Sequence, residues 1–267
     1  MHSKYCRRLP KLPKSLKQAI NSKTTVYEKA LSNRGFFCLY SFPMQYPDPH
    51  SFINIHTHHK PKLDDEFVIR NAFMKLSASQ IEALNYPVSV GLHPWHLHQM
   101  TVNECMDQLI ELATLPNVLA IGEIGIDKAI ETPVSKQIEY FDAQLTVAKA
   151  VQKPLIIHAV RSYTEFVPFL KKTKLPFIFH QFQGNEQQAK ELLKYNVKLS
   201  FGKNLFEPKS AEVFTKLPND AFLLETDVAH SIHIGDIYNK AAEIKGLDPA
   251  ELKSIVFHTF AQIVHRP

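Results

Sequence analysis

From Ser51 onward, short apolar runs alternate with stretches of helical periodicity. The apolar runs are rich in β-branched and aromatic residues and are too short for helices, so they predict strands. There are eight of them, at residues 52–55, 67–69, 88–90, 118–121, 155–157, 177–179, 197–201 and 222–224. Apolar positions at helical spacing lie between most of them, as at residues 104–115, 136–151, 163–172, 186–195 and 209–217.

This alternation predicts the fold class. Strands that are apolar on both faces and are separated by helices indicate a parallel sheet with helices covering it. Eight such units predict an α/β protein with a (β/α)8 TIM-type barrel, and a doubly wound open sheet is the alternative. Only residues 60–66 separate the first two strands, so we expect no helix in the first crossover.

The composition excludes several classes of protein. The chain has 267 residues, of which 45% are hydrophobic, and no apolar run approaches the roughly 20 residues of a membrane span. Its three cysteines, Cys6, Cys38 and Cys105, are odd in number and widely scattered, so they form no disulfide framework. A reducing, cytoplasmic setting is therefore predicted.

Charge is distributed unevenly along the chain. Residues 1–50 carry nine Lys and Arg and two acidic residues, which gives a net charge of +7. Since the whole chain has a net charge of +5, residues 51–267 have a net charge of −2. We interpret residues 1–43 as a basic leader, either disordered or a non-native extension translated upstream of a start at Met44. Residues 44–267 are expected to form the barrel domain.

Histidines and carboxylates gather at the ends of the predicted strands. The C-terminal ends of barrel strands converge on one rim, where barrel enzymes carry their sites. The residues concerned are His56 and His58 after the first strand, His93 after the third, Glu123 after the fourth, His158 after the fifth, His180 after the sixth and Asp227 after the eighth.

These residue types point to metal binding. In His56-Thr-His58, alternate residues of an extended chain direct both imidazoles to one face, where they can share an ion. Imidazole and carboxylate are ligands for Zn²⁺, Mn²⁺ and similar ions, and four histidines with two carboxylates suffice for a pair. The sequence therefore predicts a site for divalent metal ions at the rim.

From about residue 52 to 264 the chain resembles the TatD family of metal-dependent hydrolases. The resemblance is carried in order by His56-Thr-His58, Gly91-Leu-His93-Pro94, Ala120-Ile-Gly-Glu-Ile-Gly-Ile-Asp127, Pro154-Leu-Ile-Ile-His158, His180 and Leu224-Glu-Thr-Asp227. It implies a phosphodiesterase, typically a deoxyribonuclease working from a DNA end, with two divalent ions (Mg, Mn or Zn). By the same resemblance, one ion is held by His56, His58 and Asp227, the other by His158 and His180, with Glu123 as the bridge and His93 beside the scissile phosphate.

A two-metal hydrolysis follows as the expected mechanism, in which Asp227 accepts the proton of a metal-activated water and His93 donates to an oxygen of the phosphate. Because the catalytic part has a net charge of −2, we expect DNA ends or short oligonucleotides as substrates rather than extended duplex. Trp95 is open to two interpretations, a stacking surface for a base or a packing residue of the rim. Two other functions stay open: a barrel hydrolase acting on another small phosphoester, ester or amide, and a metal-binding protein without catalysis.

Overall fold

The computed structural model describes residues 46–74 and 76–264. The predictions made for residues 1–43, and for Cys6 and Cys38 among them, lie outside the described residues.

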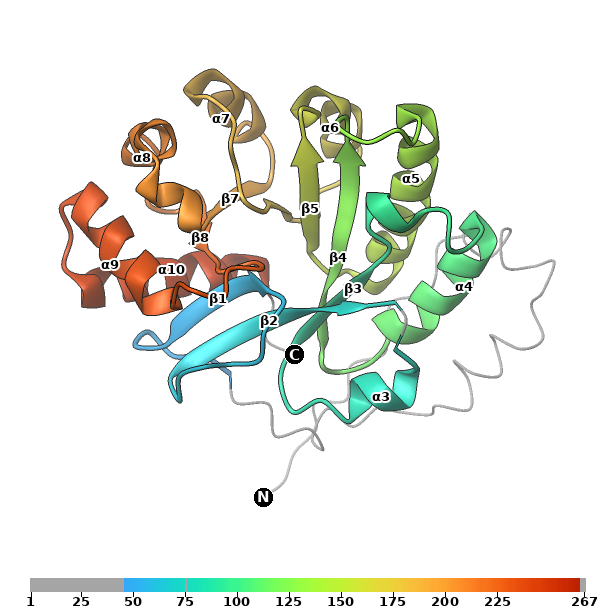
Figure 1. Ribbon diagram of the computed structural model, residues 1–267, viewed down its shortest axis with the longest axis horizontal. Coiled ribbons are helices and arrows are strands. Elements are labelled where there is room, and N and C mark those ends of the chain that lie inside the picture. The colour runs from blue at the N-terminus through green and yellow to red at the C-terminus, as the bar shows by residue number, and fades with distance from the viewer. Residues whose placement is uncertain (1–45, 75, 265–267) are drawn as a thin grey trace. The chain divides into compact units, whose positions relative to one another are not determined.

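Eight parallel strands form one sheet in which each strand pairs with the next along the chain (Figure 1). The strands are β1 (Phe52–Thr57), β2 (Glu66–Phe73), β3 (Val88–Gly91), β4 (Val118–Asp127), β5 (Leu155–Val160), β6 (Phe177–Phe179), β7 (Val197–Phe201) and β8 (Phe222–Leu224). All eight predicted strands are present. The predicted barrel is confirmed, and the doubly wound alternative is wrong, because strand order follows chain order throughout.

Helices follow most strands and flank the sheet (Figure 1). They are α3 (Ala78–Glu82), α4 (Val102–Ala113), α5 (Val134–Val151), α6 (Tyr163–Leu170), α7 (Glu186–Leu192), α8 (Pro208–Thr215), α9 (Ile234–Lys245) and α10 (Pro249–Ile263), with 3-10 turns η1 (Pro94–His96) and η2 (Lys203–Phe206). The five predicted helices agree with α4 to α8 to within a few residues. No helix lies between β1 and β2, where residues 58–65 are all described, so the short first crossover is confirmed.

The end of β4 differs from the prediction. The apolar run stops at Ile121, but the strand continues to Asp127, so Glu123 lies within β4 and not after it. Between the paired residues Ile121–Leu155 and Ile124–Ile157, β4 has one residue more than β5, which is a β-bulge. Gly125 allows the close approach of the two strands, because a Cβ there would lie 1.9 Å from the carbonyl oxygen of His158.

The barrel closes between β1 and the segment that follows β8. Thr57 and Asp227 form a parallel bridge, in which the Asp227 N–H donates to the His56 carbonyl at 3.0 Å and the His58 N–H donates to the Asp227 carbonyl at 3.0 Å. Below this bridge, the Asn54 side chain donates to the Thr226 hydroxyl at 2.8 Å. The closing contacts therefore involve the residues of the predicted metal site.

The core fills the barrel and the layer between strands and helices with buried aliphatic and aromatic side chains. Tyr46 covers one edge of it, because its ring packs on Phe67 and Phe260 and its hydroxyl donates to the Val264 carbonyl at 2.9 Å. Among the described helices, none combines the length and the apolar character that a membrane crossing requires.

Candidate metal centre

The first half of the site is formed by β1 and the segment after β8. The Nε2 atoms of His56 and His58 lie 3.4 and 3.5 Å from Asp227 Oδ1, and the two rings are 5.4 Å apart. The alternation of the extended chain thus brings both imidazoles of the His-X-His motif to one carboxylate. Asp227 has φ of +50°, a strained conformation that its two closing backbone hydrogen bonds hold in place.

Glu123 lies at the centre of the site. Its Oε2 faces β1, at 3.5 Å from His56 Nε2 and 3.8 Å from His58 Nε2. Its Oε1 faces the other way, at 2.9 Å from His158 Nδ1 and 2.8 Å from His180 Nε2. The bulge in β4 gives this side chain its position, since a bulge changes the direction of a side chain within a strand.

The second half of the site consists of His158 on β5 and His180 directly after β6. Their facing nitrogens, His158 Nδ1 and His180 Nε2, are 3.3 Å apart and converge on the same oxygen of Glu123. The structure therefore brings together all six residues predicted as metal ligands, in two groups that share Glu123.

Two buried carboxylates behind the second half were not among the predicted site residues. Asp127 Oδ2 lies 3.1 Å from His158 Nε2, and Glu225 Oε1 lies 3.4 Å from His180 Nδ1. Each faces the ring nitrogen that points away from Glu123, so each fixes the orientation of an imidazole and makes it a better ligand. Asp127 and Glu225 both lie in motifs that carry the resemblance to the TatD family, and this was the only signal in the sequence that could have identified them as site residues.

His93 has a different environment. Its Nδ1 accepts the backbone N–H of Trp95 at 3.1 Å, so the neutral ring carries its proton on Nε2, which lies 3.2 Å from Glu123 Oε1. Its distance from Glu123 and His158 would also allow metal ligation. We assign it as a hydrogen-bond donor instead, because a nitrogen that carries a proton has no lone pair for a metal.

The electrostatics of the site favour positive charge. Burial opposes a charge on His56, yet the nearby carboxylates of Asp227 and Glu123 outweigh it and raise the pKa of His56 from 6.5 to about 9. Burial acts in the opposite sense on the carboxylates, but the surrounding histidines hold the pKa of Glu123 well below its usual value and lower that of Asp227 to about 2. Both carboxylates are therefore ionised at neutral pH, which is the form that ligates metal ions.

The donor set fits divalent metal ions. Besides the set that contains His93, two sets of ligand atoms each lie within 4.8 Å of one another, and they are His56, His180 and Asp227; and His56, His58 and Glu123. The Nε2 atom of His56 is buried and makes no well-formed hydrogen bond among the described residues, since its carboxylate neighbours Asp227 and Glu123 lie 3.4 and 3.5 Å away. A buried nitrogen without a partner is costly in a folded protein, and coordination of a cation would satisfy it.

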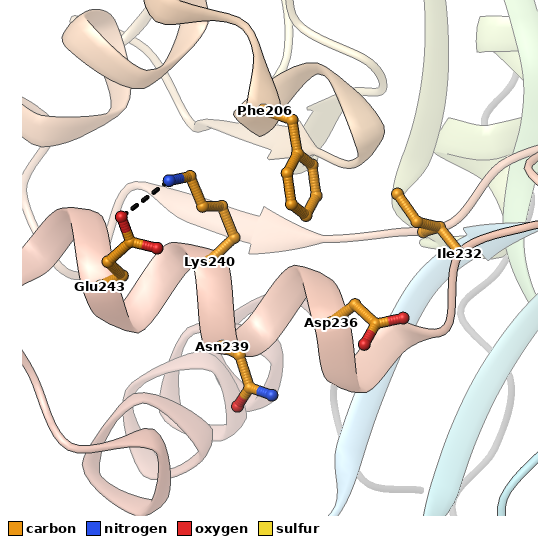
Figure 2. Close-up of a pocket in the computed structure, with 6 residues that line it drawn as sticks. All are labelled: Phe206, Ile232, Asp236, Asn239, Lys240 and Glu243. Carbon is orange, nitrogen blue, oxygen red and sulfur yellow. Dashed lines mark hydrogen bonds and ion pairs between the residues drawn. The ribbon is translucent and has the colours of Figure 1, made fainter.

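A separate pocket lies between η2 and α9, lined by Phe206, Ile232, Asp236, Asn239, Lys240 and Glu243 (Figure 2). Its charged side chains serve the helix: Asp236 accepts the backbone N–H of His233 at 3.0 Å, and Lys240 pairs with Glu243 at 2.8 Å. The candidate functional site is therefore the cluster of histidines and carboxylates at the barrel rim and not this pocket.

A parallel barrel with imidazoles and carboxylates at the C-terminal ends of its strands is the architecture of a metal-dependent hydrolase. The family model of TatD related DNases matches residues 71–265. The chain belongs to this family. His56 and His58 precede the matched segment, and the structure places them beside the residues within it.

Several characterised and uncharacterised relatives have similar sequences. An uncharacterized metal-dependent hydrolase YabD of Bacillus subtilis is 37% identical over 148 residues, which are 52% of this chain and 57% of that protein. The 3'-5' ssDNA/RNA exonuclease TatD of Citrobacter rodentium is 26% identical over 198 residues, 64% of this chain and 74% of that protein. The matched part thus spans little more than half of the length of the first of these relatives.

Solved structures agree in fold. YjjV of Escherichia coli, a TatD homologue, has a TM-score of 0.71 and 24% identity, covering 82% of this chain and 100% of that chain. A TatD family hydrolase of Entamoeba histolytica has a TM-score of 0.64 and 15% identity, covering 81% of this chain and 98% of that chain.

Proposed function

We propose that the chain is a phosphodiesterase that depends on two divalent metal ions and acts on the ends of DNA or on short oligonucleotides. The observation that supports this most directly is the position of Glu123. Its two oxygens face two separate groups of imidazoles, 3.5 and 3.8 Å away on one side and 2.8 and 2.9 Å away on the other. A carboxylate in that position can bridge two ions.

Under this proposal His56, His58 and Asp227 hold one ion, His158 and His180 hold the other, and Glu123 is shared. When bound, the ions lower the pKa of a water ligand and neutralise phosphate charge. Asp127 and Glu225 keep the rings of His158 and His180 in the orientation that directs one nitrogen at the shared carboxylate.

Asp227 is the residue best placed to take the proton of the attacking water. Its side chain is 17% exposed, whereas that of Glu123 is 6% exposed and that of His56 is fully buried. It is ionised at neutral pH because the nearby His56 outweighs the effect of burial on its pKa. It is therefore an ionised carboxylate that solvent can reach.

His93 serves the substrate. Burial lowers its pKa more than Glu123 raises it, so the ring is neutral at pH 7. With Nδ1 occupied by the Trp95 N–H, Nε2–H is the atom that can donate to an oxygen of the phosphate or to the leaving group.

The names of the relatives support nucleic acid as the substrate, since the Citrobacter rodentium protein is named a 3'-5' ssDNA/RNA exonuclease. The choice of DNA ends over duplex rests on the negative net charge of the barrel domain. The cytoplasmic location stays a prediction.

An activity panel tests the proposal. The purified chain is stripped with a chelator, reloaded with Mg²⁺, Mn²⁺ or Zn²⁺, and assayed on single-stranded DNA, duplex ends, RNA and model phosphoesters. We expect no hydrolysis in chelator, recovery with an added ion, and the highest kcat/KM on strand ends. Activity that is indifferent to chelator would overturn the metal-dependent mechanism, and preference for a small ester or amide would assign the chain to the alternative hydrolase function.

A further inference from the structure

Trp95 is the only tryptophan of the chain and lies at the edge of the proposed site, in η1 directly after His93. Its side chain is 55% exposed. A large aromatic ring left that open at the mouth of a site forgoes the stability that burial would give it. The interpretation of Trp95 as a packing residue of the rim does not account for this exposure.

Two hydrogen bonds hold Trp95 in place. Its indole Nε1–H donates to Asp127 Oδ2 at 2.7 Å, and its backbone N–H donates to His93 Nδ1 at 3.1 Å. Asp127 is 2% exposed, and its same oxygen lies 3.1 Å from His158 Nε2. The ring is thus fixed to the proposed metal site through one buried carboxylate.

The exposed part of the ring is purely apolar, because Nε1 is the only polar atom of the indole and it is bonded to Asp127. The ring centre lies 5.1 Å from that of His93 and 6.1 Å from that of His158. A phosphate bound beside His93 would therefore place the neighbouring nucleotide within reach of the indole. Rigid aromatic rings are the surfaces on which bases of single strands stack.

We propose that Trp95 is the base-binding platform of this site, on which one nucleobase of a single-stranded end stacks while its phosphate lies at the metal ions. The inference rests on the proposed function and specifies its substrate: a strand end with an unpaired base is preferred over a sugar phosphate of the same charge. Asp127 acts on this platform as a positioning residue, since it orients the ring and does not touch the base.

The test compares single-stranded DNA trimers with the same trimers lacking one base in turn at each position. For Trp95→Ala we expect KM on the intact trimer to rise roughly 5- to 100-fold, the range that loss of one base–aromatic stack produces. For one of the base-free trimers the substitution should leave KM unchanged, because the stack is already absent. Trp95→Phe keeps a ring and should lose only a few-fold. Phe206→Ala, which removes a ring of similar exposure from the pocket of Figure 2, is the matched control and should leave KM unchanged.

A second measurement does not depend on hydrolysis. Because Trp95 is the only tryptophan, fluorescence of the wild-type chain excited at the long-wavelength edge of the indole absorption, where its nine tyrosines do not absorb, reports this ring alone. We expect the intact trimer to quench it and one base-free trimer to leave it unquenched. Equal quenching by all the trimers, or an equal rise of KM on all of them in Trp95→Ala, would overturn the platform. Absence of hydrolysis on every nucleic acid would overturn the proposed function instead, and the fluorescence titration would still decide the role of Trp95.

Discussion

Replacing Glu123 by Gln tests the shared carboxylate directly. Gln has nearly the same size, so no cavity forms around this buried side chain. Its amide offers one neutral oxygen and an NH₂ group that repels a cation. If Oε1 and Oε2 serve two ions, the variant can satisfy one side of the site at most.

The magnitude follows from the electrostatics of the site. The carboxylates of Asp227 and Glu123 raise the pKa of His56 from 6.5 to about 9 against the effect of burial. A rise of that size corresponds to roughly 3 kcal/mol of net stabilisation of one positive charge by the two carboxylates, after the cost of burial. A divalent ion in direct contact with Glu123 would lose more than this. We therefore expect at least one metal equivalent to be lost and kcat/KM to fall by about 10²-fold or more, since 1.4 kcal/mol is tenfold.

The assay combines metal analysis of the purified variant, kinetics on a strand end and a thermal melt. The fold should persist, because a Gln oxygen can still accept the Asn71 side-chain N–H that now bonds to Glu123 Oε2 at 3.2 Å. Glu82→Gln, which changes an exposed carboxylate at the end of α3, is the control and should alter none of the three readouts. Full activity with two ions bound in Glu123→Gln would refute the bridging role.

Three further predictions concern other parts of the molecule. His93→Ala should lower turnover by about 10²–10⁴-fold while metal content stays unchanged, and loss of metal would instead make His93 a ligand. Burial lowers the pKa of Lys153 to about 7, below its value of about 10.4 in the unfolded chain, so the unfolded state binds more protons at this residue between these values and the contribution of Lys153 to the free energy of unfolding should rise with pH across that window. His56, whose pKa is raised to about 9, acts in the opposite sense, but it is common to the wild type and Lys153→Met. In urea titrations at pH 7 and 9, the free energy of unfolding of the wild type minus that of Lys153→Met should therefore be larger at pH 9. A chain that starts at Met44 should match the full chain in melting temperature and kcat/KM. A chain that starts at Ser51 loses the contacts of Tyr46 and should melt several degrees lower. An equal drop of the melting temperature in both shortened chains would show that residues 1–43 contribute to stability.

The strands were predictable because a parallel strand covered on both sides needs a continuous apolar run. The same logic failed at β4. Its apolar run ends at Ile121, and the next residues, Gly122 and Glu123, read as the start of a loop. A bulge and the close approach at Gly125 keep this polar segment in the sheet, and neither leaves a trace in hydrophobic periodicity.

The grouping of the candidate ligand residues was predictable for a topological reason: the ends of parallel barrel strands meet at one rim, so histidines far apart in sequence lie close in space. The buried carboxylates behind them were not assigned. The partnership of Asp127 with His158 depends on the register between β4 and β5, and that of Glu225 with His180 depends on a contact between the segments after β8 and β6. Sequence spacing carries no information about either distance.

The closure of the barrel links its fold to its chemistry. β8 has three residues and forms no ladder with β1, so the backbone of Asp227 supplies the bridge that completes the ring of strands. The side chain of the same residue faces His56 and His58, whose own strand is the other partner of the bridge. A change in the backbone at Asp227 would therefore both displace a proposed ligand and open the barrel, whereas a change in its side chain alone would affect only the proposed metal site. This is why a residue in a strained left-handed conformation is kept at the point where the barrel closes.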